Sequence, residues 1–290
     1  MEASTIVVLG GPAAGKTVFL TALYHHLWQG SDEFKIRAAS GVVHSELLAA
    51  AEQIRVGNMP PATQALRHLE FELDHFGRTY YLRFLDYPGE LFRKVFYDSV
   101  VDSDEARELY DASTTADGVI ALADPESILD RTWDIDYALT NLLRFYASRG
   151  RKQPKFVLAF TKRDRTEKLV GGCVTSFVKN HLPHLAADLG EGMRLQHFCS
   201  VINTNGQITF SQADTVTAPL RSVVEAMEAE RAGERRETYL RRVRWQRAIV
   251  RGLLAVLALL MIVATFALGV VCRDHARPDP AGIPAKPHDE

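Results

Sequence analysis

Short apolar runs recur along the first 212 residues of this 290-residue chain, and each has the length of a β-strand. Residues 67–74 alternate apolar and polar side chains, which is typical of a strand with one exposed face, so we expect an edge strand there. A turn at residues 75–78 leads to the more apolar residues 79–85, and the two runs together predict an antiparallel hairpin. The other predicted strands are residues 5–9, 118–123, 155–160 and 194–201.

Segments with apolar residues at helical spacing lie between these runs. The clearest predicted helices are residues 18–28, 42–55 and 128–148, and residues 34–38 are interpreted as a short extended piece. Alternation of strands and helices is typical of an α/β fold in which helices cover both faces of a largely parallel sheet. Residues 1–212 are therefore expected to form a mainly parallel six-stranded sheet with one antiparallel edge strand and helices on both faces.

The rest of the chain has a different character, because a long polar helix predicted at residues 213–251 leads into residues 252–272, which carry no charged side chain. A helix of 21 residues crosses about 30 Å of hydrocarbon at ~1.5 Å per residue, so we predict a transmembrane helix. Eight arginines lie between residues 231 and 251. Since basic flanks stay cytoplasmic, residues 1–212 are expected in the cytoplasm, at the inner membrane if the organism is bacterial, with the proline-rich tail 273–290 on the far side.

Charge and composition exclude several classes of function. The formal net charge of −2 provides no basic field for nucleic acid. The three cysteines, Cys173, Cys199 and Cys272, are too far apart for a short metal motif and indicate neither zinc nor a disulfide framework. The histidine pairs at positions 25/26 and 181/184 are interpreted as structural or solvent-facing.

Residues 10–17 fit the pattern G-x-x-x-x-G-K-[ST] and lie between a predicted strand and a predicted helix. Glycines let the backbone curl around an anion, and the positive end of the following helix faces a phosphate. Lys16 is predicted to reach the β- and γ-phosphates of a nucleotide, and Thr17 to bind Mg²⁺. The predicted phosphate-binding positions are Gly10, Gly11, Pro12, Ala13, Ala14, Gly15, Lys16, Thr17 and Val18.

Asp86 and Gly89 form a D-x-x-G pattern directly after the predicted strand at residues 79–85. Asp86 is predicted to hold Mg²⁺, and the Gly89 N–H to bond the γ-phosphate while the nucleotide is intact. A loop threonine would complete this metal site and sense the γ-phosphate. We expect that residue to be Thr63 rather than Thr79, which belongs to a strand.

Thr161, Lys162 and Asp164 follow another predicted strand and fit [NT]-K-x-D. A carboxylate at this place accepts N–H bonds from the ring nitrogen and the exocyclic amine of guanine, which adenine does not offer, and an unpaired buried acceptor costs roughly 1–3 kcal/mol. Lys162 is expected to lay its stem along the base. Ser200 and Val201, in a turn after the last predicted strand, are expected near the guanine carbonyl oxygen, although an ordinary serine-containing turn explains that stretch equally well.

In this order the three motifs resemble the Ras-like small GTPase superfamily over residues 4–205. The additional helix at 42–55, the Pro-Pro-Ala-Thr stretch at 60–63 and the Asp-Tyr-Pro-Gly-Glu stretch at 86–90 look most similar to the bacterial double-GTPase family. The resemblance implies a switch that binds GTP and GDP with Mg²⁺, and whose loops around Thr63 and Gly89 order on GTP and relax after hydrolysis. It also implies protein partners: an effector, an activating protein or a second GTPase domain in a dimer.

The sequence departs from the small GTPases where the rate of hydrolysis is set. Glu90 stands where they place a glutamine that orients water, and a carboxylate there can act as a base but is repelled by the γ-phosphate. No arginine lies shortly before Thr63 to act as a finger, and Arg93 and Lys94 are interpreted as surface residues. We therefore predict a catalytic set of Lys16, Glu90 and Thr63 with slow intrinsic GTP hydrolysis.

Two other functions stay open at this point. A P-loop ATPase or kinase would make the match at residues 161–164 accidental. A nucleotide-binding scaffold with little catalysis would resemble the signal-recognition-particle receptor β subunit, which also combines a small GTPase with one membrane span.

Overall fold

The computed structural model describes residues 4–31, 33–61, 63–130, 134–148, 153–189, 194–204 and 207–274. From residue 250 onwards only the helix backbone is described. The chain divides into two compact units, residues 1–229 and 230–290, and the first unit contains the sheet and the predicted nucleotide motifs.

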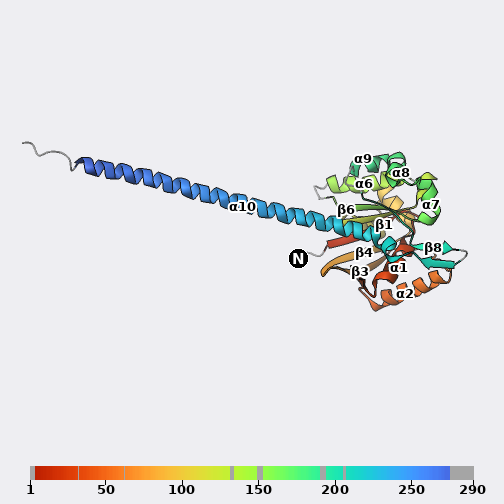
Figure 1. The fold of residues 1–290 in the computed structure, drawn as a ribbon. Helices are drawn as coiled ribbons and strands as arrows, with labels where there is room; N and C mark the ends of the chain where they lie inside the picture. Colours follow the sequence, from red (N-terminus) through yellow and green to blue (C-terminus); the bar gives the residue numbers. More distant parts are fainter. Residues whose placement is uncertain are drawn as a thin grey trace, which may run out of the picture. The chain divides into compact units, whose positions relative to one another are not determined.

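The main sheet has seven strands among the described residues, in the order β2-β3-β4-β1-β5-β6-β7 (Figure 1). Their bounds are β1 (Ser4–Gly10), β2 (Phe34–Ala38), β3 (Arg67–His75), β4 (Arg78–Asp86), β5 (Gly118–Ala123), β6 (Lys155–Phe160) and β7 (Arg194–His197). Of these strands only β3 runs antiparallel to the others. The expected α/β fold with a mainly parallel sheet is confirmed. The predicted number of six strands was wrong, and so was the prediction that the antiparallel strand forms the edge of the sheet.

The edge of the sheet is β2, the segment that had been interpreted only as a short extended piece. Phe34 and Ile36 are each 1% exposed, whereas Lys35 and Arg37 between them are exposed. β2 pairs with β3 from Phe34 opposite His75 onwards, which moves β3 one place in from the edge. Five residues carry too little periodicity to identify a strand alone, and the pairing with β3 supplies the missing stabilisation.

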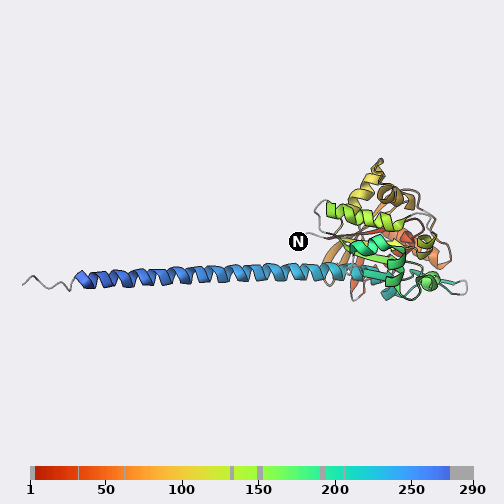
Figure 2. The same cartoon turned by 90° about the horizontal axis from the view of Figure 1, so that it is seen from above.

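Helices cover both faces of the sheet (Figures 1 and 2), as predicted. One face packs against α1 and the first turns of α10 through a cluster that includes Phe19, Leu220 and Val223. The opposite face packs against α4 and α6 through residues such as Leu109 and Leu142. The helices of the first unit are α1 (Lys16–Leu27), α2 (Gly41–Arg55), α3 (Gly89–Phe92), the π-helix η1 (Arg93–Tyr97), α4 (Asp104–Thr115), α5 (Pro125–Leu129), α6 (Ile135–Ser148), α7 (Arg163–Val170), α8 (Val174–His181) and α9 (Pro183–Leu189).

Two predicted elements are divided in the structure. The helix expected at 128–148 appears as α5 and α6, and residues 131–133 between them lie outside the described residues. The strand expected at 194–201 ends at His197, because the chain then turns and Val201 opens a separate hairpin of β8 (Val201–Thr204) and β9 (Gln207–Phe210). At the open end of this hairpin, the Ser211 N–H donates to the Ser200 carbonyl over 3.0 Å.

The helix α10 (Ala213–Asp274) includes the predicted juxtamembrane and membrane-spanning segments. Within the residues that could be searched, we find no helix with a stretch long and apolar enough to cross a bilayer. The side chains of residues 252–272 and the whole tail 275–290 lie outside the described part of the chain. The predicted span therefore stays a prediction.

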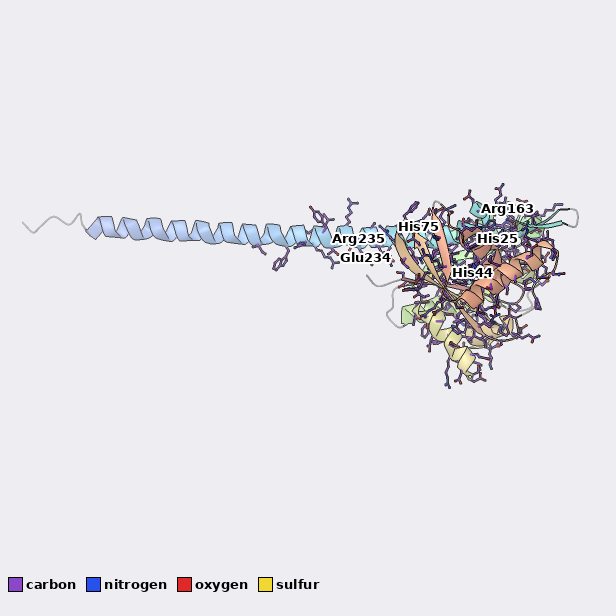
Figure 3. The ribbon with its side chains drawn as sticks, turned by 90° about the horizontal axis from the view of Figure 1, so that it is seen from below. His25, His44, His75, Arg163, Glu234 and Arg235 are labelled. Atoms are coloured by element: carbon purple, nitrogen blue, oxygen red, sulfur yellow. The ribbon has the colours of Figure 1, made fainter. Side chains whose placement is uncertain are left out.

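The paired histidines at positions 25 and 26 take part in packing between α1 and the β9 segment. His25, labelled on α1 in Figure 3, stacks on Phe210 with ring centroids 4.7 Å apart. The His26 Nε2 lies 2.8 Å from the Ser211 carbonyl oxygen. In the part of the chain that the structure describes, no group of three or more His, Cys, Asp and Glu side chains is arranged to hold a metal.

Candidate nucleotide-binding site

The loop between β1 and α1 is shaped by its glycines. A Cβ on Gly10 would lie 2.9 Å from the Leu122 carbonyl oxygen of β5, so a side chain there would push the two strands apart. Gly15, which precedes α1, has φ +77°, a left-handed conformation that favours glycine. Ala13 adopts φ +54° without that freedom, which indicates that the rest of the loop imposes its conformation.

Lys16, the first residue of α1, is 7% exposed and points back at the loop. Its ammonium donates to the carbonyl oxygens of Gly10 and Gly11 over 3.2 Å each and lies 4.5 Å from the centre of the Tyr87 ring. Burial lowers the pKa of Lys16 to about 8, against the attraction of Asp86 and Glu90. A bound phosphate chain would supply the negative charge that this buried ammonium lacks.

The three residues predicted to bind Mg²⁺ meet at one carboxylate oxygen. Thr17 and Thr63 donate their hydroxyls to the Asp86 Oδ1 over 3.2 and 2.7 Å. Asp86 ends β4 and is 7% exposed, while Thr79 lies exposed at the other end of that strand. Two hydroxyls and a carboxylate are hard oxygen donors of the kind that Mg²⁺ prefers, so this donor set fits the ion.

The D-x-x-G segment lies directly on the phosphate loop. A Cβ on Gly89 would come within 2.3 Å of both Pro12 N and Pro12 Cα, so no other residue fits there. The buried Tyr87 hydroxyl accepts a bond from the Gly10 N–H over 2.9 Å and donates to the Gly10 carbonyl over 3.0 Å. Burial raises the pKa of Tyr87, which keeps this hydroxyl protonated as a donor. Tyr87 occupies a variable position of the D-x-x-G motif, and although it belongs to the Asp-Tyr-Pro-Gly-Glu stretch, no role had been predicted for its side chain.

Two adjoining cavities of about 370 and 330 Å³ lie above this loop, one on the phosphate side and one beside the T-K-x-D segment. Both are lined by Gly15, Val18, Met59 and Lys162, so together they form a continuous elongated site. Met59, on the loop that follows α2, was missed in the sequence because a single loop methionine carries no pattern. It lies at the junction of the two cavities.

The second cavity, the base cavity, is lined by the predicted guanine-binding residues. The Thr161 N–H donates to the Ala123 carbonyl over 2.9 Å, and Lys162 adopts φ +57° before α7 begins. The Lys162 ammonium donates to the Asp124 Oδ2 over 2.5 Å, and Asp124 is 4% exposed. Asp164 lines the same cavity, and in the described part of the chain its carboxylate is engaged in no hydrogen bond or ion pair.

The turn at Ser200 closes the base cavity on the other side. Ser200 and Val201 both line it, and the preceding Phe198 joins the two motifs, since its carbonyl accepts the Arg163 N–H over 3.0 Å. The structure thus brings this turn beside the T-K-x-D segment, and its predicted place near the guanine carbonyl oxygen stays a prediction. Arg163 is labelled at the start of α7 in Figure 3.

Glu90 lines the phosphate-side cavity from the first turn of α3 and is exposed. Arg93 and Lys94 do not line this cavity; they form ion pairs with Asp98 at 3.9 Å and with Asp102 at 2.6 Å. Among the described residues, no arginine borders the phosphate-side cavity.

Two solved structures that resemble this chain are elongation factors, and this chain spans about a third of the length of each. Translation elongation factor SelB from Methanococcus maripaludis, in complex with the GTP analogue GPPNHP, is 12% identical with a TM-score of 0.38; 79% of this chain aligns to 35% of that one. A bacterial selenocysteine-specific elongation factor EF-Sec is 14% identical with a TM-score of 0.40, and 78% of this chain aligns to 29% of that one. A comparison with curated protein sequences gave no match.

A comparison with protein families gave a clear assignment. The sequence model of the Double-GTPase 1 family matches residues 7–155, about half of the chain, from the middle of β1 to the start of β6. The matched region contains the phosphate loop, Thr63 and the D-x-x-G segment, which meet in the structure. The chain therefore belongs to the Double-GTPase 1 family, a family of GTP-binding P-loop proteins.

Proposed function

We propose that this protein is a guanine-nucleotide switch that binds GTP and GDP with Mg²⁺ and hydrolyses GTP slowly. One observation carries the proposal: a single elongated site has the buried Lys16 and the Asp86 oxygen cluster at one end and, at the other, the Asp164 carboxylate, which has no partner among the described residues. A nucleoside triphosphate has the matching order of charges, with the phosphates at one end and a hydrogen-bonding base at the other. Membership of the Double-GTPase 1 family supports the guanine assignment.

In the bound state, backbone N–H groups of residues 11–18 and the Lys16 ammonium would hold the phosphates. Thr17, Thr63 and Asp86 would hold Mg²⁺, which neutralises charge on the β- and γ-phosphates. Because Thr63 already bonds to Asp86, the loop that carries it is placed to respond to the ion. The Gly89 N–H would bond the γ-phosphate.

On the base side, Asp164 would accept the two N–H groups of the guanine edge, while Thr161, Ser200 and Val201 shape the cavity around it. Lys162 would cover the base with its stem, with its ammonium held by Asp124. Adenine offers no donor pair to a carboxylate at this place, so ATP is expected to bind more weakly.

Slow hydrolysis follows from what borders the phosphates. Glu90 is the candidate to orient the attacking water, but its carboxylate is repelled by the γ-phosphate. The described lining of that cavity includes no arginine. Stabilisation of the charge that develops on the phosphates therefore depends on Lys16, the basic residue of the phosphate loop. A protein partner that supplies an arginine would then accelerate the reaction.

The proposal includes a membrane location, which rests on sequence. The uncharged run at residues 252–272 and the eight arginines before it favour a single span with the nucleotide-binding unit in the cytoplasm. A switch at a membrane would act on protein partners at that surface, such as an effector or a second GTPase domain.

Competition binding with the full-length protein tests the nucleotide assignment. A fluorescent GDP should be displaced by GTP and GDP but not by ATP, and Asp164→Asn should shift the preference towards xanthine nucleotides, whose ring offers a matching acceptor. Equal displacement by ATP would indicate an ATPase or kinase instead. A single-turnover assay then distinguishes a slow GTPase, which converts its bound GTP, from a scaffold that leaves it intact.

A further inference from the structure

Tyr87 connects the D-x-x-G segment to the phosphate loop by binding both the N–H and the carbonyl of Gly10. Its side chain is 0% exposed, and its hydroxyl binds Gly10 twice, accepting from the N–H and donating to the carbonyl. The Gly10 N–H is therefore engaged before any phosphate arrives. A hydroxyl that satisfies a donor and an acceptor on the same residue fixes that residue more firmly than a single bond does.

The ring of Tyr87 also forms one wall of the space occupied by the Lys16 ammonium. Two of the ammonium's bonds go to the carbonyls of Gly10 and Gly11, and the ring lies 4.5 Å away on another side. The face of an aromatic ring attracts a cation, and the attraction grows when water is excluded, as it is here. Lysine has a long flexible stem, so its direction depends on such neighbours.

A second contact holds the two segments together beside the first. Gly89 is pressed against Pro12 so closely that a Cβ would lie 2.3 Å from the proline ring nitrogen. On its far side, the Tyr87 ring stacks with Phe92 of α3, with ring planes 15° apart and centroids separated by 6.4 Å. Tyr87 therefore connects α3 to the phosphate loop, with Lys16 beside it.

We propose that Tyr87 is a positioning residue of the nucleotide site, whose hydroxyl fixes the phosphate loop at Gly10 and whose ring directs the Lys16 ammonium towards the phosphates. The proposal rests on the proposed function. Tyr87 acts through Gly10 and Lys16 and is not a catalytic residue. Phenylalanine at this position keeps the ring and removes both hydroxyl bonds to Gly10, whose carbonyl then keeps the Lys16 ammonium as a donor, while leucine removes both the bonds and the ring.

The chain offers a matched control in Tyr80, which lies in β4, seven positions before Tyr87. Tyr80 is also 0% exposed, and its hydroxyl donates to the Glu228 Oε1 over 2.9 Å, away from the residues that line the site. Tyr80→Phe therefore removes one buried hydroxyl and its bond without touching the phosphate loop. Any effect of lost stability alone should appear in both phenylalanine variants.

The test measures release of fluorescent GDP from full-length wild type, Tyr87→Phe, Tyr87→Leu and Tyr80→Phe, with thermal unfolding recorded for each. A release rate describes folded, loaded molecules only, so a merely structural role does not change it. We expect release to be about tenfold faster for Tyr87→Phe and faster again for Tyr87→Leu, with Tyr80→Phe within about twofold of wild type.

Release from Tyr87→Phe at the rate of Tyr80→Phe would overturn the proposal, even if Tyr87→Leu is too unstable to load. Equal rates of GDP release from Tyr87→Phe and Tyr87→Leu would show that the ring does not direct the Lys16 ammonium, and would overturn that half of the proposal. Failure of the wild type to bind GDP at all would instead refute the proposed function, so the two failures are distinguishable.

Discussion

Replacing Asp124 by alanine should disturb both the stability of the first unit and the base side of its nucleotide site. The Asp124 carboxylate accepts the Lys162 ammonium over 2.5 Å and caps α5 by accepting the Glu126 N–H over 3.1 Å. Asp124 is 4% exposed, whereas the Lys162 side chain is 28% exposed. In Asp124→Ala the ammonium can therefore turn partly to water, but it loses the anchor that holds it over the base cavity.

The two interactions give the size of the effect. Loss of a helix cap costs about 1 kcal/mol. Loss of a charge-assisted hydrogen bond costs about 1.5–3 kcal/mol, and access to water keeps the remaining penalty on Lys162 small. The free energy of unfolding should fall by about 2.5–4 kcal/mol in Asp124→Ala, whereas Asp124→Asn keeps the cap acceptor and should lose only about 1.5–3 kcal/mol, the contribution of the bond to Lys162.

Urea unfolding of the nucleotide-free full-length protein measures these values in wild type, Asp124→Ala, Lys162→Met and the double variant. The coupling between the two sites should be about 1.5–3 kcal/mol, because either single change breaks the same ion pair. Ser103→Ala is the matched control, since Ser103 caps α4 by accepting the Ala106 N–H over 3.2 Å and pairs with no lysine. It should lose about 1 kcal/mol and bind GDP normally.

Two results would refute this reasoning. Additive effects of Asp124→Ala and Lys162→Met, within about 0.5 kcal/mol, would mean that the short contact contributes nothing to stability. Unchanged affinity for GDP in Asp124→Ala would mean that the placement of Lys162 over the base cavity does not depend on its anchor.

Three further predictions concern other parts of the first unit. Gly89→Ala should bind GDP more weakly and lose about 1–3 kcal/mol of stability, because the added Cβ overlaps Pro12. The control Gly41→Ala, whose Cβ meets nothing within 4 Å, should keep both its GDP affinity and its stability. Equal behaviour of the two variants in melting and binding assays would contradict the close contact. Thr63→Ala should weaken GTP binding about tenfold with Mg²⁺ present and not in EDTA, and Thr79→Ala should bind normally; the same loss in EDTA would remove Thr63 from the metal site. Desolvation alone would raise the pKa of Glu228, but hydrogen bonds from Tyr80 and His75 and the charge of Arg78 outweigh it and lower that pKa below its ordinary 4.5. The Glu228 carboxylate therefore stabilises the fold above pH 4.5, and this contribution is lost as the pH falls through the lowered pKa. The difference in unfolding free energy between wild type and Glu228→Gln, measured at each pH, should shrink below pH 4.5 and not above it.

The meeting of the motifs could be predicted because of where they stand on strands. Gly10, Asp86 and Thr161 come at or directly after the carboxyl ends of β1, β4 and β6, which all point to one edge of the sheet. Strand ends are readable from apolar runs, and parallel strands bring their ends together whatever the loops do. The position of the phosphate loop, the D-x-x-G segment and the T-K-x-D segment after predicted strands is therefore enough to expect them at one edge of the sheet.

The partners of these residues could not be predicted in the same way. Tyr87 and Met59 reach the site from positions with no pattern, and their roles depend on side-chain directions across loops. Asp124 did leave a signal, because it is a polar residue directly after the buried run 118–123, which pairs with the strand that Thr161 follows. The edge strand β2 was missed for the opposite reason, since five residues become a strand only through their pairing with β3.

The hairpin of β3 and β4 has the nucleotide site at one end and contacts that stabilise the fold at the other. At one end Arg67 is opposite Asp86, and at the other His75 is opposite Arg78, nine paired positions in all. That far end is held by Glu228 of α10, which bonds His75 over 3.2 Å and Arg78 over 3.0 Å (His75 is labelled in Figure 3).

Nine residues are separated by eight steps of about 3.3 Å, which puts roughly 26 Å between the two ends, beyond the range over which substitutions usually interact. Thr63→Ala and Glu228→Gln should therefore be additive within about 0.5 kcal/mol in unfolding free energy. Glu228→Gln should also leave the release rate of GDP unchanged. A larger deviation from additivity, or faster GDP release from Glu228→Gln, would contradict this independence. It would show that the two ends of the hairpin are energetically coupled, so that nucleotide binding affects the contacts of Glu228 in α10.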